Sequence, residues 1–307
     1  MRVLVTGGAG FIGSHLVEGL LGEGHEVFAF DNLSSGKVHH IPEGVQLFQG
    51  DLGDVPTLET AFTQSKPDAI MHLAAQKSVS ASVSDPLMDA RENIIASLNL
   101  FEAAVRHRVG KIVFASTGGA LYGDTSILPT PETHATVPES PYGVAKLSIE
   151  HYLRFYVKVH GLQAVTLRMA NVYGPRQDPE GEAGVVAIFC SRALDGQAVT
   201  VYGDGQQTRD YTYVKDAARA FLLALHYEGS TSLNVGTSVE TSVLELIGGL
   251  EAIVGNKMAR RKQPTRLGEI RRSCLDASWA KHELGWQPSY GLHEGLAETV
   301  RYFRLHR

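Results

Sequence analysis

The chain has 307 residues, enough for one large hydrophobic core or two smaller ones, and 43% of it is hydrophobic and 20% charged, as in ordinary globular proteins. A formal net charge of −5 with no long run of one sign excludes the strongly charged surface that binds nucleic acid or an anionic membrane. No stretch approaches the ~20 apolar residues of a membrane span, and the first residues resemble a strand instead of a cleavable signal. We therefore expect a cytoplasmic protein whose partners are small molecules or a second copy of itself.

Short apolar segments alternate with amphipathic ones through the first half of the chain. Strands are predicted over residues 2–6, 26–30, 45–49, 68–73, 111–116 and 164–169. This alternation predicts an α/β fold with a Rossmann-type doubly wound parallel sheet. Between the strands, apolar spacing predicts a helix over 86–108 with basic residues toward its end. A second helix is predicted over 141–159, with Ser140 as N-cap and Pro141 in the first turn.

The pattern becomes mixed after about residue 170. Gly and Pro increase in "NVYGPRQDPEGEAG", and the predicted segments are shorter. We expect a first domain over 1–172 and a smaller α/β domain over 173–307, with part of 210–236 packing back onto the first domain.

The turn after the first predicted strand is rich in glycine. In "VLVTGGAGFIGSHLVEGLL", Gly7, Gly10 and Gly13 precede and open the following helix. Such a spacing alone is weak evidence, but between a strand and a helix it predicts that the backbone holds a pyrophosphate at the helix N-terminus. Asp31 ends the second strand, where a carboxylate accepts hydrogen bonds from ribose hydroxyls and repels a 2′-phosphate. NAD is therefore favoured over NADP, unless Asp31 is only a turn residue of "DNLSSG".

Two groups of polar residues lie in the middle of the chain, one at the end of a predicted strand and one in the predicted helix that follows it. Tyr142 and Lys146 in "SPYGVAK" lie at i and i+4 of the predicted helix and so share one face, and Ser116 and Thr117 end the preceding strand. A Tyr/Lys pair alone is more often a solvated helix face. Beside a dinucleotide loop it suits removal of a hydroxyl proton, because a nearby ammonium and a positive nicotinamide ring both favour the phenolate.

These motifs together resemble a known family. "TGGAGFIG", "HLAAQKSV", Ser-Thr before "LYG", "YGVAK", "NVYGPR" and "RDYTYVKD" are similar to the extended short-chain dehydrogenases/reductases, and among them to nucleotide-sugar 4-epimerases of the UDP-glucose (UDP-galactose) type. The resemblance implies an NAD-dependent isomerase, a homodimer, that interconverts UDP-glucose and UDP-galactose through a 4-keto sugar. The first domain would then bind NAD and the smaller one the nucleotide sugar.

The resemblance also implies roles for single residues. Tyr142 would be the base, Lys146 the group that lowers its pKa and anchors the ribose, and Thr117 the hydroxyl that holds the sugar O4. Residues expected to bind NAD are Gly7, Gly10, Phe11, Ile12, Gly13, Asp31, Asn32, Asp51, Leu52, Leu73, Ala74, Ala75, Lys77, Asn93, Ser116, Tyr142 and Lys146. Residues expected to bind the UDP-hexose are Lys77, Thr117, Tyr142, Asn171, Val185, Val186, Thr200, Tyr202, Arg209, Arg266, Glu269 and Ser273.

Two positions bear on the reaction and on substrate breadth. In related epimerases an aromatic residue beside the C2 substituent matches Ser273 here. A small residue leaves room for an N-acetyl group, so UDP-GlcNAc and UDP-GalNAc are expected substrates, unless Ser273 only fills a loop. Related 4,6-dehydratases carry Asp-Glu after the catalytic Thr, because elimination needs an extra acid and base; here Gly118 and Gly119 follow.

Several alternatives stay open. A 4,6-dehydratase, a UDP-glucuronate decarboxylase and a UDP-glucuronate 4-epimerase share the scaffold. A regulator that kept the fold and lost the chemistry is disfavoured, because the Tyr, the Lys and the hydroxyl are all present.

The remaining reactive side chains have simpler interpretations. Cys190 and Cys274 are far apart and predict neither a disulfide nor a zinc site. His39 and His40 are interpreted as a solvated loop pair, and no local histidine spacing predicts a metal site.

Overall fold

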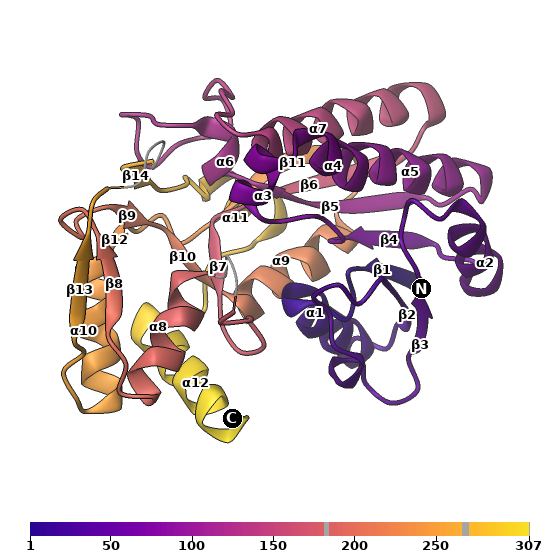
Figure 1. The fold of residues 1–307 in the computed structure, drawn as a ribbon. Coiled ribbons are helices and arrows are strands. Elements are labelled where there is room, and N and C mark those ends of the chain that lie inside the picture. The colour runs from indigo at the N-terminus through magenta and orange to yellow at the C-terminus, as the bar shows by residue number, and fades with distance from the viewer. Residues whose placement is uncertain (181–183, 266–269, 307) are drawn as a thin grey trace.

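Seven parallel strands form the central sheet of the computed structural model, which describes residues 1–180, 184–265 and 270–306 (Figure 1). The strand order is β11-β6-β5-β4-β1-β2-β3, so the chain winds outward from β1 in both directions. This confirms the predicted doubly wound fold. The strands are β1 (Arg2–Thr6), β2 (Glu26–Asp31), β3 (Gln46–Gln49), β4 (Ala69–His72), β5 (Lys111–Thr117), β6 (Gln163–Met169) and β11 (Thr231–Val235).

Helices cover both faces of this sheet because its strands are apolar on both sides. Along β1, Val3 and Val5 join one core cluster while Leu4 joins the other, as the two-residue period of a strand requires. The helices on one face are α1 (Phe11–Gly22), α9 (Val214–His226) and α11 (Ser278–Leu284), and those on the other are α2 (Val55–Ser65), α5 (Ala96–Arg106) and α7 (Pro141–His160).

The predicted boundaries agree with the structure within about one residue for the six strands. Helix α7 begins as predicted: the Ser140 hydroxyl accepts a hydrogen bond from the N–H of Gly143 at 3.2 Å, and Pro141 is the first helical residue. It ends at Gly161, whose φ of 70° is left-handed.

The helix predicted over 86–108 is in fact three consecutive pieces. Helix α4 (Pro86–Ala90) leads into the π-helical turn η2 (Arg91–Ile95), and α5 follows, ending at Arg106. A π turn inserts an extra residue and shifts the helix face, which apolar spacing does not reveal. The short elements η1 (Val38–His40) and α3 (Val79–Ser84) precede this region, and α6 (Gly119–Tyr122) follows it.

Besides α9, α11 and β11, the described part of the second half forms small sheets and the helices α8, α10 and α12. Strand β7 pairs with β10, β12 and β14 flank β9, and β13 pairs with β8. These elements are β7 (Asn171–Tyr173), α8 (Val185–Leu194), β8 (Val199–Tyr202), β9 (Thr208–Arg209), β10 (Tyr211–Tyr213), β12 (Thr241–Ser242), α10 (Val243–Val254), β13 (Arg260–Gln263), β14 (Arg272–Ser273) and α12 (Leu292–Leu305). Of the segment 210–236, α9 packs on α1 and β11 extends the central sheet. The division into domains at residue 172 stays a prediction.

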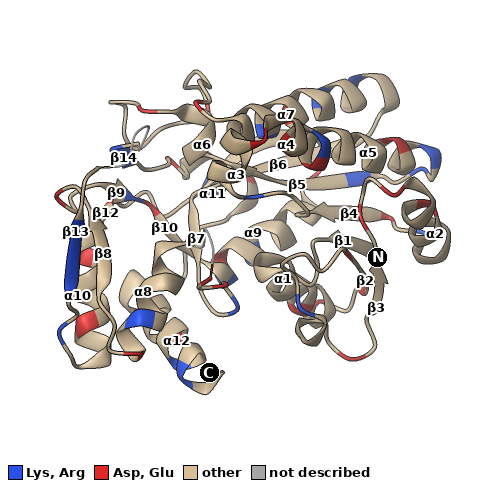
Figure 2. Cartoon of the chain, viewed as in Figure 1, with Lys and Arg blue, Asp and Glu red and all other residues tan. Residues whose placement is uncertain are grey.

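Charged residues of both signs are spread over the elements (Figure 2). The exposed strand β13 carries a short run of basic side chains. Among the described helices, none has both the length and the apolar character needed to cross a membrane.

Candidate active site

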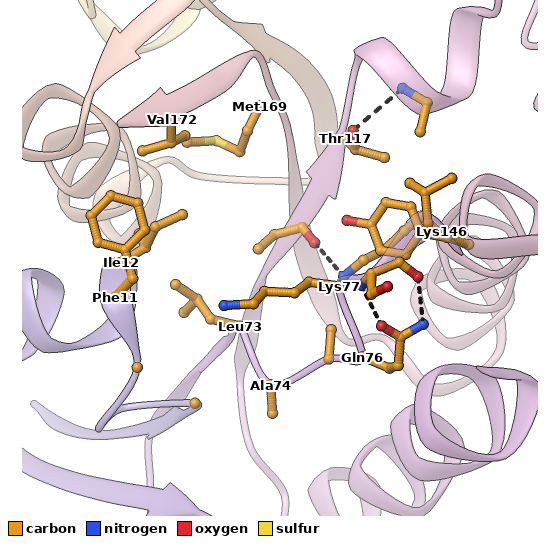
Figure 3. A pocket seen from close by; sticks show the side chains of 18 of the residues that line it. Phe11, Ile12, Leu73, Ala74, Gln76, Lys77, Thr117, Lys146, Met169 and Val172 are labelled. Carbon is orange, nitrogen blue, oxygen red and sulfur yellow. Dashed lines mark hydrogen bonds between the residues drawn. The ribbon is translucent and has the colours of Figure 1, made fainter. Parts of the chain in front are cut away.

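A cleft of about 890 Å³ lies at the carboxyl ends of the central strands. Gly7 follows β1, Asp31 ends β2, Leu73 follows β4, and Thr117 ends β5, and all four line it. Ligands of open α/β sheets bind at this edge. In Figure 3, Lys77, Thr117 and Lys146 extend into one space from three different elements.

The glycine turn fits closely between β1 and α1. A Cβ on Gly13 would lie 2.0 Å from the Gly7 carbonyl oxygen, and a Cβ on Gly7, whose φ is +71°, would lie 2.8 Å from the Ala74 nitrogen. Helix α1 has no side-chain cap at Gly10. The N–H groups of its first turn are therefore left for an anion, as a pyrophosphate requires.

Asp31 is anchored at the end of β2. Its two carboxylate oxygens accept hydrogen bonds from the Ala9 N–H at 3.0 Å and the Leu33 N–H at 2.8 Å. The Asn32 side chain donates to Asp51 at 2.8 Å, which joins the ends of β2 and β3. This end of the cleft thus offers fixed acceptors suited to ribose hydroxyls.

His40 departs from the interpretation as a solvated loop residue. Its side chain is buried, and Nδ1 lies 3.2 Å from the Ala9 carbonyl. The ring therefore packs beneath the glycine turn.

Lys146 is held beneath Tyr142 on α7. The Lys146 ammonium donates to the Ala115 carbonyl at 3.0 Å and lies 5.9 Å from the centre of the Tyr142 ring. Thr117 ends β5, and its hydroxyl accepts from the Ala120 N–H at 3.4 Å. The structure thus brings the three predicted catalytic side chains to one end of the cleft.

Burial shifts the pKa of both members of the Tyr/Lys pair. Burial raises the pKa of the Tyr142 phenol to about 12, with a further rise from the Asp89 carboxylate. Burial lowers the pKa of Lys146 to about 8, although Asp89 and Glu150 oppose that shift. In the protein alone Tyr142 is therefore a neutral phenol, and a positive charge is needed beside it to favour the phenolate.

Ser116 also lines the cleft, but its hydroxyl bonds a side chain of α7. Its hydroxyl donates to Glu150 at 2.6 Å. Glu150 also forms a buried salt bridge of 2.7 Å with Arg168, which donates to the Tyr122 hydroxyl at 2.8 Å. These residues link β5, α7 and β6 behind the catalytic side chains.

The two glycines after Thr117 have different surroundings. A Cβ on Gly118 would lie 2.5 Å from the Leu275 side chain, whereas a Cβ on Gly119 would lie 3.3 Å from the Ser273 hydroxyl. Of the pair, Gly119 lines the cleft, as does Ser273. Packing therefore requires Gly118, whereas at Gly119 the Ser273 hydroxyl would closely contact any added Cβ.

Arg209 places a positive charge on the side of the cleft that is formed by the second half of the chain. Its guanidinium donates to the Thr208 carbonyl at 2.7 Å, and it forms no salt bridge with any described carboxylate. Asn171, on β7, lines the same side. Such an arginine suits a phosphate group.

Most of the residues predicted to bind ligands line this cleft: Gly7, Gly10, Phe11, Ile12, Gly13, Asp31, Asn32, Asp51, Leu52, Leu73, Ala74, Ala75, Lys77, Ser116, Thr117, Tyr142, Lys146, Asn171, Arg209 and Ser273. Five others are not among its lining residues: Asn93, Val185, Val186, Thr200 and Tyr202. Arg266 and Glu269 lie outside the described residues.

Sequence reasoning missed Gln76 and Asp89. The Gln76 amide lines the cleft and donates to Asp89 at 2.8 Å, and the Asn93 amide donates to the same carboxylate at 2.9 Å. Asp89 is buried. The motif "HLAAQKSV" contains Gln76, but nothing in the sequence indicated that the π turn places Asp89 and Asn93 behind it.

Comparison with known proteins identifies the family of the chain. The model of the NAD dependent epimerase/dehydratase family matches residues 3–236. A UDP-glucose 4-epimerase from Mycolicibacterium smegmatis is 45% identical over 309 residues, covering 99% of each chain. The structure of a UDP-glucose 4-epimerase from Thermotoga maritima with UDP-glucose has a TM-score of 0.97 at 48% identity, covering 99% of each chain. That of the Thermus thermophilus enzyme with NAD has a TM-score of 0.96 at 46% identity, covering 100% of each.

Proposed function

We propose, from the premise that the chain belongs to the NAD dependent epimerase/dehydratase family, that it is a UDP-glucose 4-epimerase. The observation that carries this proposal is the meeting of Thr117, Tyr142 and Lys146 at one end of the cleft, with an arginine free of described salt bridges at its other side. The relatives named above, which align over the whole chain, are UDP-glucose 4-epimerases.

The cofactor is NAD, and the cleft fits it. The uncapped first turn of α1 would hold the pyrophosphate, and Asp31 the adenosine ribose. When bound, NAD accepts a hydride from the sugar C4 and returns it. When NAD is bound, its positive nicotinamide ring would favour the phenolate of Tyr142 and so oppose the rise in pKa that burial causes.

In this reaction the side chains move one proton. Tyr142 takes the proton of the 4-hydroxyl while hydride leaves C4, Thr117 holds O4, and Lys146 stabilises the phenolate. The 4-keto sugar turns in the cleft, which Gly119 lines. Hydride then returns to the opposite face and Tyr142 gives the proton back, so that no net oxidation occurs.

We extend the proposal to N-acetylhexosamines. Ser273 lines the cleft, and a small side chain there leaves unfilled the volume that an aromatic side chain would occupy. UDP-GlcNAc and UDP-GalNAc are then substrates as well as UDP-glucose and UDP-galactose.

The second copy of the chain is proposed to dock on α7 and its neighbours. Apolar side chains stand exposed along this face: Leu87 (69%), Ile95 (52%), Val144 (48%), Tyr152 (42%), Phe155 (49%) and Val159 (57%). Exposed apolar patches of this kind mark interfaces. Light scattering should give about twice the 33.2 kDa chain mass, and Phe155→Glu should shift it to one chain; a wild-type monomer at micromolar concentration would contradict the homodimer.

A labelled substrate tests the reaction. With UDP-galactose deuterated at C4, we expect UDP-glucose that keeps its deuterium at C4, because the same hydride leaves and returns. A dehydratase would instead release water and form a 6-deoxy-4-keto sugar, and a decarboxylase would show no turnover without a C6 carboxylate. Either outcome would exclude the proposed reaction.

A further inference from the structure

Three side chains of the types that bind metal ions lie close together at the edge of the sheet opposite the cleft. Glu23 caps α1, His25 immediately precedes β2, and His226 is the last residue of α9. One ligand atom from each lies within 4.8 Å of the other two. Glu23 and His25 belong to one turn, but His226 lies 203 residues beyond Glu23, which is why local spacing predicted no metal site.

Close packing of α1 on α9 creates this cluster (Figure 1). A Cβ on Gly19 would lie 2.9 Å from the Leu222 side chain, so glycine lets the helices approach. The turn at Gly24, with φ +79°, then places Glu23 and His25 on either side of it. Both helices end here, and the negative ends of their dipoles favour a cation.

The spacing of the ligand atoms matches a tetrahedral ion. Glu23 Oε2 lies 3.5 Å from His25 Nε2 and 3.5 Å from His226 Nε2. Two atoms each about 2.1 Å from one tetrahedral zinc ion lie roughly 3.4 Å apart. The remaining pair closes by rotation of His226, whose side chain is 59% exposed.

His25 gives independent evidence for a ligand. Its side chain is only 9% exposed, and Nε2 has no hydrogen-bond partner among the described residues. A buried nitrogen without a partner is costly. Nδ1 lies 3.3 Å from the Met1 amino group, which orients the ring so that Nε2 faces Glu23.

We propose that Glu23, His25 and His226 bind one divalent transition-metal ion of the zinc class, with water in the fourth position. Two imidazoles and one carboxylate suit zinc, whereas magnesium and calcium prefer oxygen ligands. The ion ties the α1–β2 turn to the end of α9. It stabilises the fold and takes no part in the chemistry of the cleft, so it is independent of the proposed function.

Zinc titration of tag-free protein by calorimetry tests the site. The titration is run at about pH 8, because zinc binds the deprotonated forms of its ligands. We expect one equivalent of zinc to bind, a rise in Tm with zinc, and no rise with magnesium. His226→Ala should weaken zinc at least tenfold, as should Glu23→Gln.

The matched control is His282→Ala, which removes a histidine that is 84% exposed and outside the cluster. It should bind zinc as the wild type does. Both cluster variants alter exposed side chains, and unchanged circular dichroism will verify their folding. Failure of the wild type to bind a stoichiometric zinc ion, or unchanged affinity in His226→Ala, would overturn the proposal.

Discussion

Burial sets the charge of the catalytic pair at the scale of single residues. The protein alone raises the pKa of Tyr142 to about 12 and lowers the pKa of Lys146 to about 8. Tyr142 therefore becomes a base only when positive charge stands next to it. The nicotinamide ring is positive in oxidised NAD and neutral in the reduced form, so proton and hydride movements would be coupled.

Replacing Tyr142 with Phe removes the only proton acceptor that we assign to the reaction. We expect kcat to fall by about 10²–10⁴-fold, the usual contribution of a positioned acid or base. NAD should remain bound, because the glycine turn and Asp31 are untouched. Initial rates and the cofactor content of purified protein measure both effects. Activity comparable to the wild type would refute the assignment.

Ser273 sets the space beside the sugar in our account. Ser273→Tyr should reduce kcat/KM for UDP-GalNAc at least tenfold more than for UDP-galactose, because the added ring occupies the volume near Gly119. Ser273→Ala serves as the matched control and should leave the ratio unchanged. Equal losses for both substrates would argue against a gate at this position.

Elements position these residues through a polar network that the sequence did not reveal. Thr117 and Ser116 are neighbours on β5 and both line the cleft, yet the Thr117 hydroxyl accepts from the Ala120 N–H and the Ser116 hydroxyl bonds Glu150 on α7. Alternation along the strand predicts the divergence. The partners of Ser116 come from α7 and β6, and only the packing of those elements brings them together.

Replacing Glu150 tests how much this network contributes to the free energy of unfolding. Glu150→Gln leaves the buried Arg168 without its counterion, which typically costs about 3–5 kcal/mol. Urea denaturation should show this loss in the free energy of unfolding. Adding Arg168→Met should recover part of it, because no charge is then left unpaired. A single variant as stable as the wild type would contradict the importance of the pair.

Strand positions were predictable, whereas the irregular turns were not. Apolar runs located the six predicted strands within about one residue, since a parallel sheet buries both faces. The π turn at Arg91–Ile95 escaped prediction because a single added residue leaves apolar spacing almost unchanged. It carries Asn93 into the interior, where the side chain bonds Asp89.

At the scale of the whole molecule, the part of the site that the second half of the chain contributes was the hardest to predict from local patterns. Gly7, Asp31, Thr117 and Tyr142 belong to local motifs, and all line the cleft. The resemblance assigned Val186 to the UDP-hexose site, which stays a prediction, and the side chain is buried in the core formed with α10 and α12. Short segments after residue 170 meet through long-range packing, which local patterns do not encode.

A buried histidine links global stability to pH. Burial, with a smaller effect of Lys146, lowers the pKa of His72 to about 3 from an ordinary value of 6.5. Below pH 6.5, His72 is protonated in the unfolded chain but stays neutral in the folded chain. The free energy of unfolding that is present above pH 6.5 therefore decreases as the pH falls toward 3.

Thermal and urea unfolding between pH 6.5 and 4 measure this effect. The free energy of unfolding should fall with pH, and His72→Gln should reduce the slope by up to about 1.4 kcal/mol per pH unit, the contribution of one proton. His15, whose pKa burial lowers to about 4, keeps part of the slope in the variant. An identical slope in both proteins would contradict the neutral state of His72.

Epimerisation by the purified protein tests the central claim most directly. UDP-galactose and, separately, UDP-GalNAc are incubated with the NAD-loaded protein and followed by NMR without added reductant. We predict that UDP-glucose and UDP-GlcNAc appear, respectively, until each mixture reaches a constant ratio of epimers, with no net change in NADH. Unchanged UDP-galactose together with unchanged UDP-GalNAc would contradict the assignment of this chain as an epimerase.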